Sequence, residues 1–447
     1  MRTYRELFRT REFTPLFMTG AARVAAQTVT GLALGTVIYA ETGSPLLAAL
    51  AMFGPSLAQL IGATVLLSAA DRLAPRATLA GLALVFALAT AAQAIPGLPV
   101  WGAFVLLTCT GPLAALDGGV RYGLLNEVLP AAGFVLGRSV LNMSVGTMQI
   151  GGFALGGVLA TALSPRQTLL AGAVLYLVAA VVARLGLSRR APRAGGRPSV
   201  AATWRGNARL WSSVPRRYVY LALWVPNGLI VGCESLFVSY DPDDAWVLFT
   251  FAALGMLAGD TITGRFMTDH WRDRLAAPLR LLLGVPFLIF VWQPPLLVAV
   301  TAVTVASVGY SASLLLQRRL LALTPDELSG HALGLQSAGM LAMQGVGATI
   351  AGAVAQYTSP AIAMTAMAVA SVAITVALAS GLRAPVPGGP VDEFRGVAVE
   401  GPAREQLEVE VAAAPEDRVR ARSRADHREE RHVDAVDQAR GHQRPVQ

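Results

Sequence analysis

The sequence has 447 residues, of which 54% are hydrophobic and only 14% are charged, well below the charged fraction of about a quarter that soluble domains carry. All 36 basic residues are arginines, and they give the chain a formal net charge of +8. This composition excludes an ordinary soluble domain. Arginines in the loops of a membrane protein explain the charge better than a nucleic-acid surface does, so no nucleic-acid partner is expected.

Long runs without any charged residue determine the fold class. Four of them cover residues 42–70, 77–116, 281–317 and 332–382. A membrane-spanning helix needs about 20 mainly apolar residues, so each of the three longest runs holds at least two spans. The sequence therefore predicts an all-α membrane protein that crosses the lipid bilayer many times.

Six spanning helices are expected in the first half of the chain. After a charged leader at residues 1–12, they cover about 13–39, 45–69, 77–95, 100–124, 138–163 and 167–187. Prolines and glycines mark the turns between them, most clearly at residues 96–99 inside the 77–116 run. These six helices form the first predicted domain, residues 1–187.

A basic connector at residues 188–217 follows, with eight arginines and no acidic residue. The second domain, residues 218–383, is expected to hold six more helices. They cover about 218–240, 245–264, a span ending near 292 after a charged loop at 265–280, a span reaching 316, 330–357, and a last one ending by 382. From residue 384 onward the sequence becomes charged and contains prolines, which predicts a disordered cytoplasmic tail.

Arginines are distributed very unevenly over the predicted loops. The N-terminus and every second loop carry 22 of them, whereas the opposite loops carry only Arg166. Cytoplasmic loops of membrane proteins are enriched in basic residues. Both termini are therefore expected in the cytoplasm, with the chain in the inner (plasma) membrane.

The two halves echo each other in sequence. Pro130 and Pro325 lie 195 positions apart, and so do the glycine-rich segments 152–157 and 347–352. Such an offset predicts two parallel six-helix repeats, related by a pseudo-twofold axis along the membrane normal, with a substrate site between them. The expected fold is twelve transmembrane helices in two pseudo-symmetric bundles.

At these positions the sequence resembles the major facilitator superfamily of transporters, over roughly residues 5–383. The family has a Gly-x-Leu-Ala-Asp-Arg-x-Gly-Arg-Arg loop after its second helix. Asp71, Arg72 and Arg76 match that loop, and Asp269 and Arg272 repeat it in the second half. The resemblance implies gating charges at these five positions, although they would equally serve to hold the topology.

The predicted fifth helix resembles the Gly-Pro-x-x-Gly-Gly signature of proton-driven exporters in that family. Gly152, Gly156 and Gly157 match, and Phe153 stands in place of the proline. Residues 121–130 also resemble the drug, macrolide and siderophore exporter branch. Glycines four apart remove side-chain bulk from one helix face, so close helix packing is expected there, with a role in gating as the alternative.

Two residues are expected to place charge deep in the membrane. Arg23 lies eleven residues beyond Glu12, which is about 16 Å along a helix, and Gln27 shares its face. Because a charge in hydrocarbon is costly, we expect Arg23 to contact a substrate anion or to take part in proton coupling. The alternative is a structural salt bridge with another helix.

Glu234 is the second deep charge, sixteen residues or about 24 Å into its helix. Removal from water favours the protonated form of a carboxyl group, so Glu234 is the expected proton-coupling residue. The alternative is a partner for a polar group near the outer rim. Asn227 follows Pro226, which is expected to kink this helix. Gln149, Gln344 and Tyr310 are further cavity candidates, each with interhelical hydrogen bonding as the alternative.

Asp117 and Arg121 are four residues apart near the inner end of the fourth helix, and we expect them to act as gating charges that pair with each other or with loop arginines, with substrate binding as the alternative. The sequence has no phosphate-binding Gly-Lys-Ser/Thr motif and no metal-ligand spacing, so no enzyme, cofactor or metal is expected.

The favoured function is proton-coupled efflux of amphipathic small molecules by a monomer. Uptake of a small anion at Arg23, or a non-transporting scaffold or sensor, are the alternatives.

Overall fold

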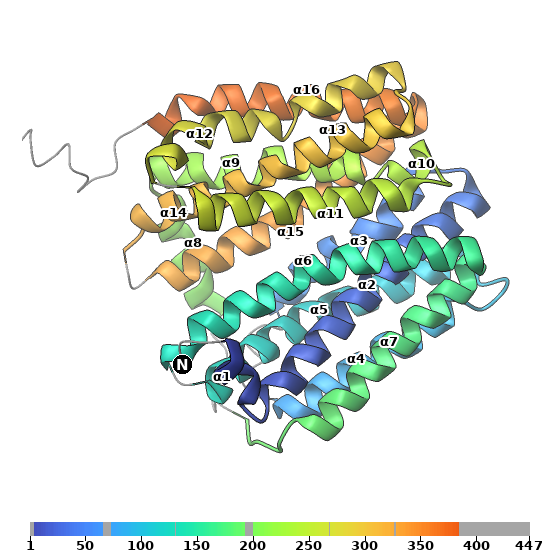
Figure 1. Ribbon diagram of the computed structural model, residues 1–447, viewed down its shortest axis with the longest axis vertical. Coiled ribbons are helices and arrows are strands. Elements are labelled where there is room, and N and C mark those ends of the chain that lie inside the picture. Colours follow the sequence, from blue (N-terminus) through green and yellow to red (C-terminus); the bar gives the residue numbers. More distant parts are fainter. Residues whose placement is uncertain are drawn as a thin grey trace, which may run out of the picture. The chain divides into compact units, whose positions relative to one another are not determined.

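The computed structural model describes residues 4–65, 73–129, 131–192, 200–267, 269–325 and 328–383. Every regular element within these ranges is a helix (Figure 1), which confirms the predicted all-α class. The predicted tail, residues 384–447, lies outside the described residues, and so do Asp71, Arg72 and Pro130.

Seven helices make up the first half of the described chain. They are α1 (Tyr4–Arg9), α2 (Phe13–Thr42), α3 (Pro45–Val65), α4 (Pro75–Gln93), α5 (Val100–Val128), α6 (Ala131–Ala162) and α7 (Pro165–Gly186). Residue types at the helix ends explain several of the turns. Ser164 and Gln167 form a capping box at the start of α7, and Gly43, in the left-handed conformation (φ 62°), ends α2.

The second half contains shorter pieces as well as long helices. They are α8 (Val200–Trp211), α9 (Val214–Glu234), α10 (Phe237–Tyr240), α11 (Ala245–Thr261), the π-helical turn η2 (Ile262–Phe266), α12 (Asp269–Leu282), η3 (Val285–Trp292), α13 (Leu296–Val308), η4 (Gly309–Ser311), α14 (Ala312–Ala322), α15 (Ser329–Tyr357), α16 (Pro360–Ala379) and η6 (Gly381–Arg383).

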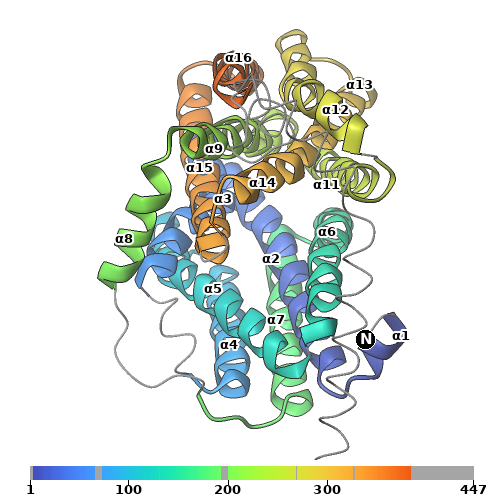
Figure 2. The same ribbon diagram turned by 90° about the vertical axis from the view of Figure 1, so that its left-hand side faces the viewer.

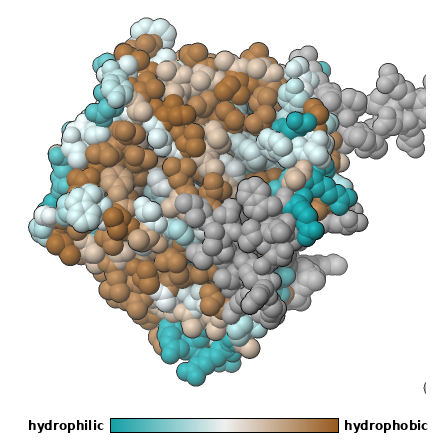
Figure 3. Space-filling view, turned by 180° about the vertical axis from the view of Figure 1, so that it is seen from behind, coloured by the Kyte–Doolittle hydropathy of each residue, from teal (hydrophilic) through white to brown (hydrophobic). Residues whose placement is uncertain are grey.

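The helices match the predicted membrane spans in length and composition. Ten of those described are long and apolar enough to cross a bilayer, and two shorter apolar helices, Pro45–Leu60 and Ala277–Trp292, stand where the second and ninth spans were predicted. Apolar side chains cover much of the face seen in Figure 3, as expected for a surface in contact with lipid.

Two predicted loops are wrong. The connector 188–217 contains α8, and α9 already begins at Val214. The charged loop 265–280 is largely helical as well, because it holds the end of η2 and most of α12. In both segments arginines alternate with apolar residues at helical spacing, so a high charge content concealed amphipathic helices.

The helices pack into two groups, which we call the first bundle (α2–α7) and the second bundle (α9–α16), seen in Figures 1 and 2. In the first bundle α2 packs against α7, α6 and α3, and α4 packs against α7 and α5. In the second, α9 packs against α15 and α16, and α11 packs against α13. The bundles meet where α15 lies along α3 and α11 lies along α6.

Equivalent glycines make equivalent contacts in the two bundles, as the sequence repeat predicts. Gly152 of α6 packs on Thr28 of α2, and Gly347, 195 positions later in α15, packs on the backbone of Gly228 in α9. A methyl group at either glycine would collide with that neighbour. In each bundle the fifth long helix therefore closely approaches the first.

The same repeat holds for contacts between the bundles. Gly157 of α6 faces the ring of Trp246 at the start of α11, whereas Gly352 of α15 faces the backbone of Leu46 at the start of α3. Each fifth helix thus uses one glycine inside its own bundle and another, five residues on, against the second helix of the other bundle. These matching contacts support the predicted pseudo-twofold relation between the two bundles.

We call the end of the helices with α1, α8 and residues 187–192 the basic end, and the opposite end the distal end.

At the basic end α8 is held against the second bundle. Trp211 stacks on Tyr220 and Trp224, with ring centroids 6.1 and 5.7 Å away. His331 Nε2 lies 2.7 Å from Asn207 Oδ1, so the connector includes a helix docked on α9 and α15.

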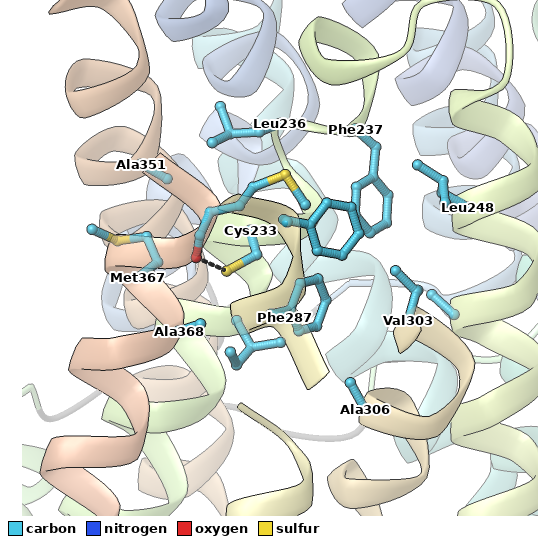
Figure 4. Packing of buried hydrophobic residues seen from close by; sticks show 14 of the residues in the cluster. Cys233, Leu236, Phe237, Leu248, Phe287, Val303, Ala306, Ala351, Met367 and Ala368 are labelled. Atoms are coloured by element: carbon cyan, nitrogen blue, oxygen red, sulfur yellow. Dashed lines mark hydrogen bonds between the residues drawn. The ribbon is translucent and has the colours of Figure 1, made fainter. Parts of the chain in front are cut away.

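The largest buried apolar cluster lies inside the second bundle (Figure 4). Its members include Phe237, Phe287 and Leu248, all at most 2% exposed. The Cys233 thiol donates a hydrogen bond of 3.2 Å to the Met364 carbonyl oxygen within it. This cluster surrounds the end of α9, where the next residue, Glu234, is also buried.

Candidate functional site

Each bundle holds one cluster built around a deeply buried charge, apart from Arg216 and Arg280, which are buried elsewhere in the second bundle. In the first, Arg23 of α2 forms an ion pair with Asp117 of α5, with 2.9 Å between Nε and Oδ2. The two side chains are 12% and 4% exposed. Arg23 Nη1 also donates a hydrogen bond of 3.3 Å to Gln27 Oε1, one turn along the same helix. Arg23 thus makes the cross-helix salt bridge that was its alternative reading.

The positions of Asp117 and Arg121 differ from those expected of gating charges. Both lie deep inside the first bundle, 3% and 6% exposed, and the ion pair of Asp117 goes to Arg23 across the bundle. The Arg121 guanidinium occupies space beside Gly20, where a methyl group would come within 2.8 Å of it, and lies 5.3 Å from the centroid of the Tyr122 ring. The turn of α5 that carries Asp117 faces α2, which explains the choice of partner.

A small polar cavity of about 110 Å³ adjoins Arg23 within the first bundle. Its lining draws polar side chains from five helices, α2, α3, α4, α5 and α7: Arg23, Gln27, Thr30, Ser56, Gln59, Thr90, Gln93, Thr110 and Tyr176. A water molecule occupies about 30 Å³ in the liquid, so the cavity suits a few waters or one small polar solute.

The second cluster consists of Glu234 and Tyr310. Glu234 is 6% exposed, and its Oε1 accepts a hydrogen bond of 3.3 Å from the Tyr310 hydroxyl. Glu234 is the last residue of α9, and a two-residue turn, Ser235 and Leu236, separates it from α10. Tyr310 lies in η4, a 3₁₀ turn between α13 and α14. The hydrogen bond therefore joins two helical segments at the places where the regular α-helix of each ends.

The surroundings of Glu234 are apolar, apart from Tyr310. Cys233 and Leu236, on either side of it in the sequence, belong to the buried cluster of Figure 4, and within the described part of the chain no cationic side chain lies within 4.0 Å of its carboxyl group. A carboxylate removed from water needs a counter-charge or a proton. Glu234 therefore has the surroundings of a group that gains and loses a proton as its exposure changes.

Asn227 has a structural role that differs from the predicted kink. Helix α9 continues through Pro226, and the interruption lies nine residues further on, at Ser235 and Leu236. The Asn227 amide donates hydrogen bonds to the Leu223 carbonyl oxygen (2.6 Å) and to Ser313 Oγ of α14 (3.0 Å). Its contact is thus interhelical, the alternative that the sequence suggested for the uncharged candidates.

The remaining predicted pathway residues stand apart from these clusters. Gln149 on α6 and Gln344 on α15 are partly buried. In the described helices, neither lines the cavity beside Arg23 nor hydrogen-bonds to Glu234.

The predicted gating loops are described only in part. Asp269 and Arg272 fall in the first turns of α12, a helix where a loop was expected. Arg76 belongs to the first turn of α4 and lines a groove between α4 and α7. Asp71 and Arg72 lie outside the described residues, so the expected latch stays a prediction.

Gly156 packs on Val29 and Leu32 of α2, one turn beyond the contact of Gly152. Phe153, between them, points to the other bundle and stacks on Phe249 of α11, with ring centroids 4.7 Å apart and planes 14° apart. The resemblance singled out position 153 only for its missing proline. The structure gives this residue a contact between the bundles.

Two polar contacts between the bundles were not foreseen from the sequence. The Tyr39 hydroxyl donates to the Ser239 carbonyl oxygen (3.4 Å), and Ser44 Oγ donates to Gln356 Oε1 (2.7 Å). Together with the Phe153–Phe249 stack they lie toward the distal end, and we call these three contacts the distal seam. Serine and tyrosine beside a turn are too common to indicate an interface, so no pattern in the sequence marks them.

The described residues include no group of three or more histidine, cysteine, aspartate or glutamate side chains that could hold a metal ion. The Arg23 cluster and the Glu234 cluster differ in the chemical groups that they can bind. The Arg23 cluster has guanidinium donors beside a polar cavity and can bind an anionic or polar group. The Glu234 cluster can hold a proton.

Comparison with known proteins identifies the fold. No family model and no curated protein matches the chain. Solved structures do: a bacterial homologue of the human lysosomal transporter Spinster, in an inward-facing, unoccupied conformation, has a TM-score of 0.64 at 12% identity over 86% of this chain and 97% of its own. The nucleoside transporter NupG has a TM-score of 0.69 at 12% identity, covering 83% and 100%.

A POT family transporter solved with a thioalcohol-conjugated peptide is similar as well, with a TM-score of 0.65 at 10% identity over 82% of this chain and 95% of its own. At these identities the likeness concerns the fold alone. The chain therefore has the fold of these solved transporters, the all-α fold with many membrane-spanning helices that its sequence predicted.

Proposed function

We propose that this protein is a proton-coupled secondary transporter that works by alternating access. The observation that carries the proposal is the buried Glu234 carboxyl group, which has a phenol as its hydrogen-bond donor and lies where α9 and the α13–α14 helix are both interrupted. A proton taken up or released there changes the charge of the helix junction, and a change of shape can follow.

The arginine distribution supports an orientation with the basic end in the cytoplasm of the cell, in the inner (plasma) membrane. In that orientation the distal seam lies on the outer side of the membrane. Both termini are then cytoplasmic. We propose that a single chain carries out transport, because each bundle supplies a half of the seam.

The favoured cargo is an amphipathic small molecule that is exported. Support comes from the surfaces where the bundles meet, which carry aromatic and aliphatic side chains such as Phe153, Phe249 and Trp246. The deep charges are withdrawn from these surfaces, because Arg23 is paired within the first bundle and Glu234 lies in the core of the second. A sugar-like solute would require many more polar partners.

Uptake of a small anion is the second candidate, and the polar cavity beside Arg23 favours it. The guanidinium uses Nε for Asp117 and Nη1 for Gln27, which leaves donors for an oxyanion.

Transport in everted membrane vesicles tests the proposal. With the interior acidified, vesicles containing the protein should accumulate amphipathic dyes, and Glu234→Gln should abolish the dependence on the proton gradient. Glu41→Gln is the matched control, because Glu41 is a partly exposed carboxylate paired with Arg166 at the distal end.

Equal accumulation by wild type and Glu234→Gln would remove Glu234 as the coupling group. Accumulation of an organic anion in right-side-out vesicles, lost in Arg23→Gln, would favour uptake. Absence of gradient-dependent flux for every compound would favour a scaffold or sensor.

A further inference from the structure

A large groove lies on the outside of the first bundle, between α4 and α7. Its volume is about 830 Å³, within the range of small-molecule sites. Helix α4 begins at the basic end and α7 finishes there, so the first residues of α4 lie beside the last residues of α7. The apolar part of the lining consists of Ala74, Ala77, Ala80, Gly81, Leu84, Leu177, Ala180, Val181 and Leu185.

Small residues create the depth of this groove. Nothing lies within 4 Å of the position that a methyl group at Gly81 would occupy, so the groove is open above the α4 backbone. Leu84, Leu177 and Val181 border it and are 44%, 46% and 48% exposed. From Arg76 to Leu84 is eight residues, or about 12 Å along α4, which is close to the roughly 15 Å of one leaflet of the hydrocarbon core.

Arginines crowd the rim of the groove at the basic end. Arg76, Arg184, Arg189 and Arg190 all line it. Arg190 is paired with Glu12 (3.1 Å) and Glu127 (3.3 Å). Among the described residues no carboxylate lies within 4.0 Å of the other three guanidinium groups, and Arg76 Nε is buried without a hydrogen-bond partner.

We propose that this groove binds an anionic phospholipid from the leaflet at the basic end. The phosphate of the headgroup accepts hydrogen bonds from Arg76, Arg184 and Arg189, and an acyl chain lies over Gly81 between α4 and α7. Guanidinium groups suit phosphate oxygens, and basic pockets between helices on the cytoplasmic side attract acidic lipids. A free phosphate ion would satisfy the rim but leave the apolar groove open to solvent or lipid.

The binding site is separate from the transport pathway. It faces lipid on α4 and α7, whereas the bundles meet through α3, α6, α11 and α15. The inference depends on the membrane location of the fold and stands whether or not the protein transports an amphipathic cargo.

Lipid retention by the purified full chain in an uncharged detergent tests the site. Dioleoyl phosphatidylglycerol should stay bound in native mass spectrometry and raise the melting temperature, whereas dioleoyl phosphatidylcholine should do neither. The triple variant Arg76→Gln, Arg184→Gln, Arg189→Gln should bind phosphatidylglycerol on the order of 100-fold more weakly, at about two-thirds of a decade per arginine. Gly81→Leu, which fills the groove and keeps every arginine, should also lose the bound lipid.

The matched control is the triple variant Arg209→Gln, Arg265→Gln, Arg274→Gln, which removes the same charge at exposed positions outside the groove. It should retain phosphatidylglycerol as the wild type does. Equal weakening in both triple variants, or full retention in Gly81→Leu, would overturn the site.

Two further measurements separate the lipid from other occupants. Inorganic phosphate without lipid should leave the melting temperature unchanged, and an equal rise would indicate a soluble anion instead. A photoreactive benzoylphenylalanine placed at position 84 should gain the mass of a phospholipid on illumination in membranes. Cross-linking to residues 384–447 of the same chain would show that the protein's own C-terminal segment fills the groove.

Discussion

The Tyr310 hydroxyl donates a hydrogen bond of 3.3 Å to Glu234 Oε1 where both helices that carry these residues are interrupted. In Glu234→Gln the amide oxygen still accepts this bond, so we expect a folded protein whose flux no longer depends on pH. In Tyr310→Phe the carboxyl group loses its donor, which should cost about 1–3 kcal/mol of stability. Thermal unfolding and flux at several pH values measure the two effects. The Tyr310–Glu234 hydrogen bond would have no role if Tyr310→Phe matched the wild type in thermal unfolding and in the pH dependence of flux.

The Arg23–Asp117 ion pair leads to a prediction about stability. Asp117→Asn should be strongly destabilising, by about 3–5 kcal/mol, because it leaves Arg23 and the neighbouring Arg121 buried without the carboxylate. A double variant, Arg23→Met with Asp117→Leu, should recover much of the loss, since it removes both charges. Unfolding free energies of Arg23→Met, Asp117→Leu and the double variant give the coupling. Additive losses would contradict the prediction.

Gly157 predicts a conformational effect at the distal seam. Gly157→Ala places a methyl group against the ring of Trp246, so α6 and α11 can no longer approach as closely and the seam should open more often. Trp246 emission should shift to the red as its ring meets water. Gly151→Ala is the control, because a methyl group there, on the same helix, meets nothing within 4 Å. Identical spectra for both variants would contradict a role of the Gly157–Trp246 contact in keeping the distal seam closed.

The hydrogen bonds of Arg216 lead to a prediction about how α8 is attached to the second bundle. Its guanidinium donates to the carbonyl oxygens of Arg209 (3.1 Å) and Leu210 (3.1 Å) at the end of α8, and to that of Leu323 (3.4 Å). Charged hydrogen bonds to helix-terminal carbonyls stabilise by about 1.5–3 kcal/mol each. Arg216→Ala should therefore release α8 and accelerate proteolysis of the connector several-fold. Arg217→Ala should leave the cleavage rate near that of the wild type.

The sequence predicts the parts of the fold that depend on local pattern. Apolar runs located the spans, and the glycine echo at Gly152 and Gly347 anticipated the matching contacts with α2 and α9. Helix α8 was missed because its arginines suggested a loop, although its apolar residues recur at helical spacing.

Partners distant in sequence could not be predicted. Arg23 and Asp117 are 94 positions apart, and no periodicity indicates which face of α5 meets α2. A kink was predicted at Pro226, and α9 continues through this proline, whereas the turn that ends α9 lies at Ser235 and Leu236, which carry no such signal. There the packing around Glu234 decides where the helix stops.

The break after Glu234 divides one membrane-crossing segment into two parts with different neighbours. Upstream, Gly228 and Gly232 hold α9 backbone against backbone on α15, so that part moves with its own bundle. Downstream, α10 contacts α2 and α3 of the other bundle, and its Ser239 accepts the bond from Tyr39. Ser239 is only five positions after the buried Glu234. In the proposed function, a proton on Glu234 would thus act on the contacts at the distal end through one short stretch of backbone, without a relay of intervening side chains.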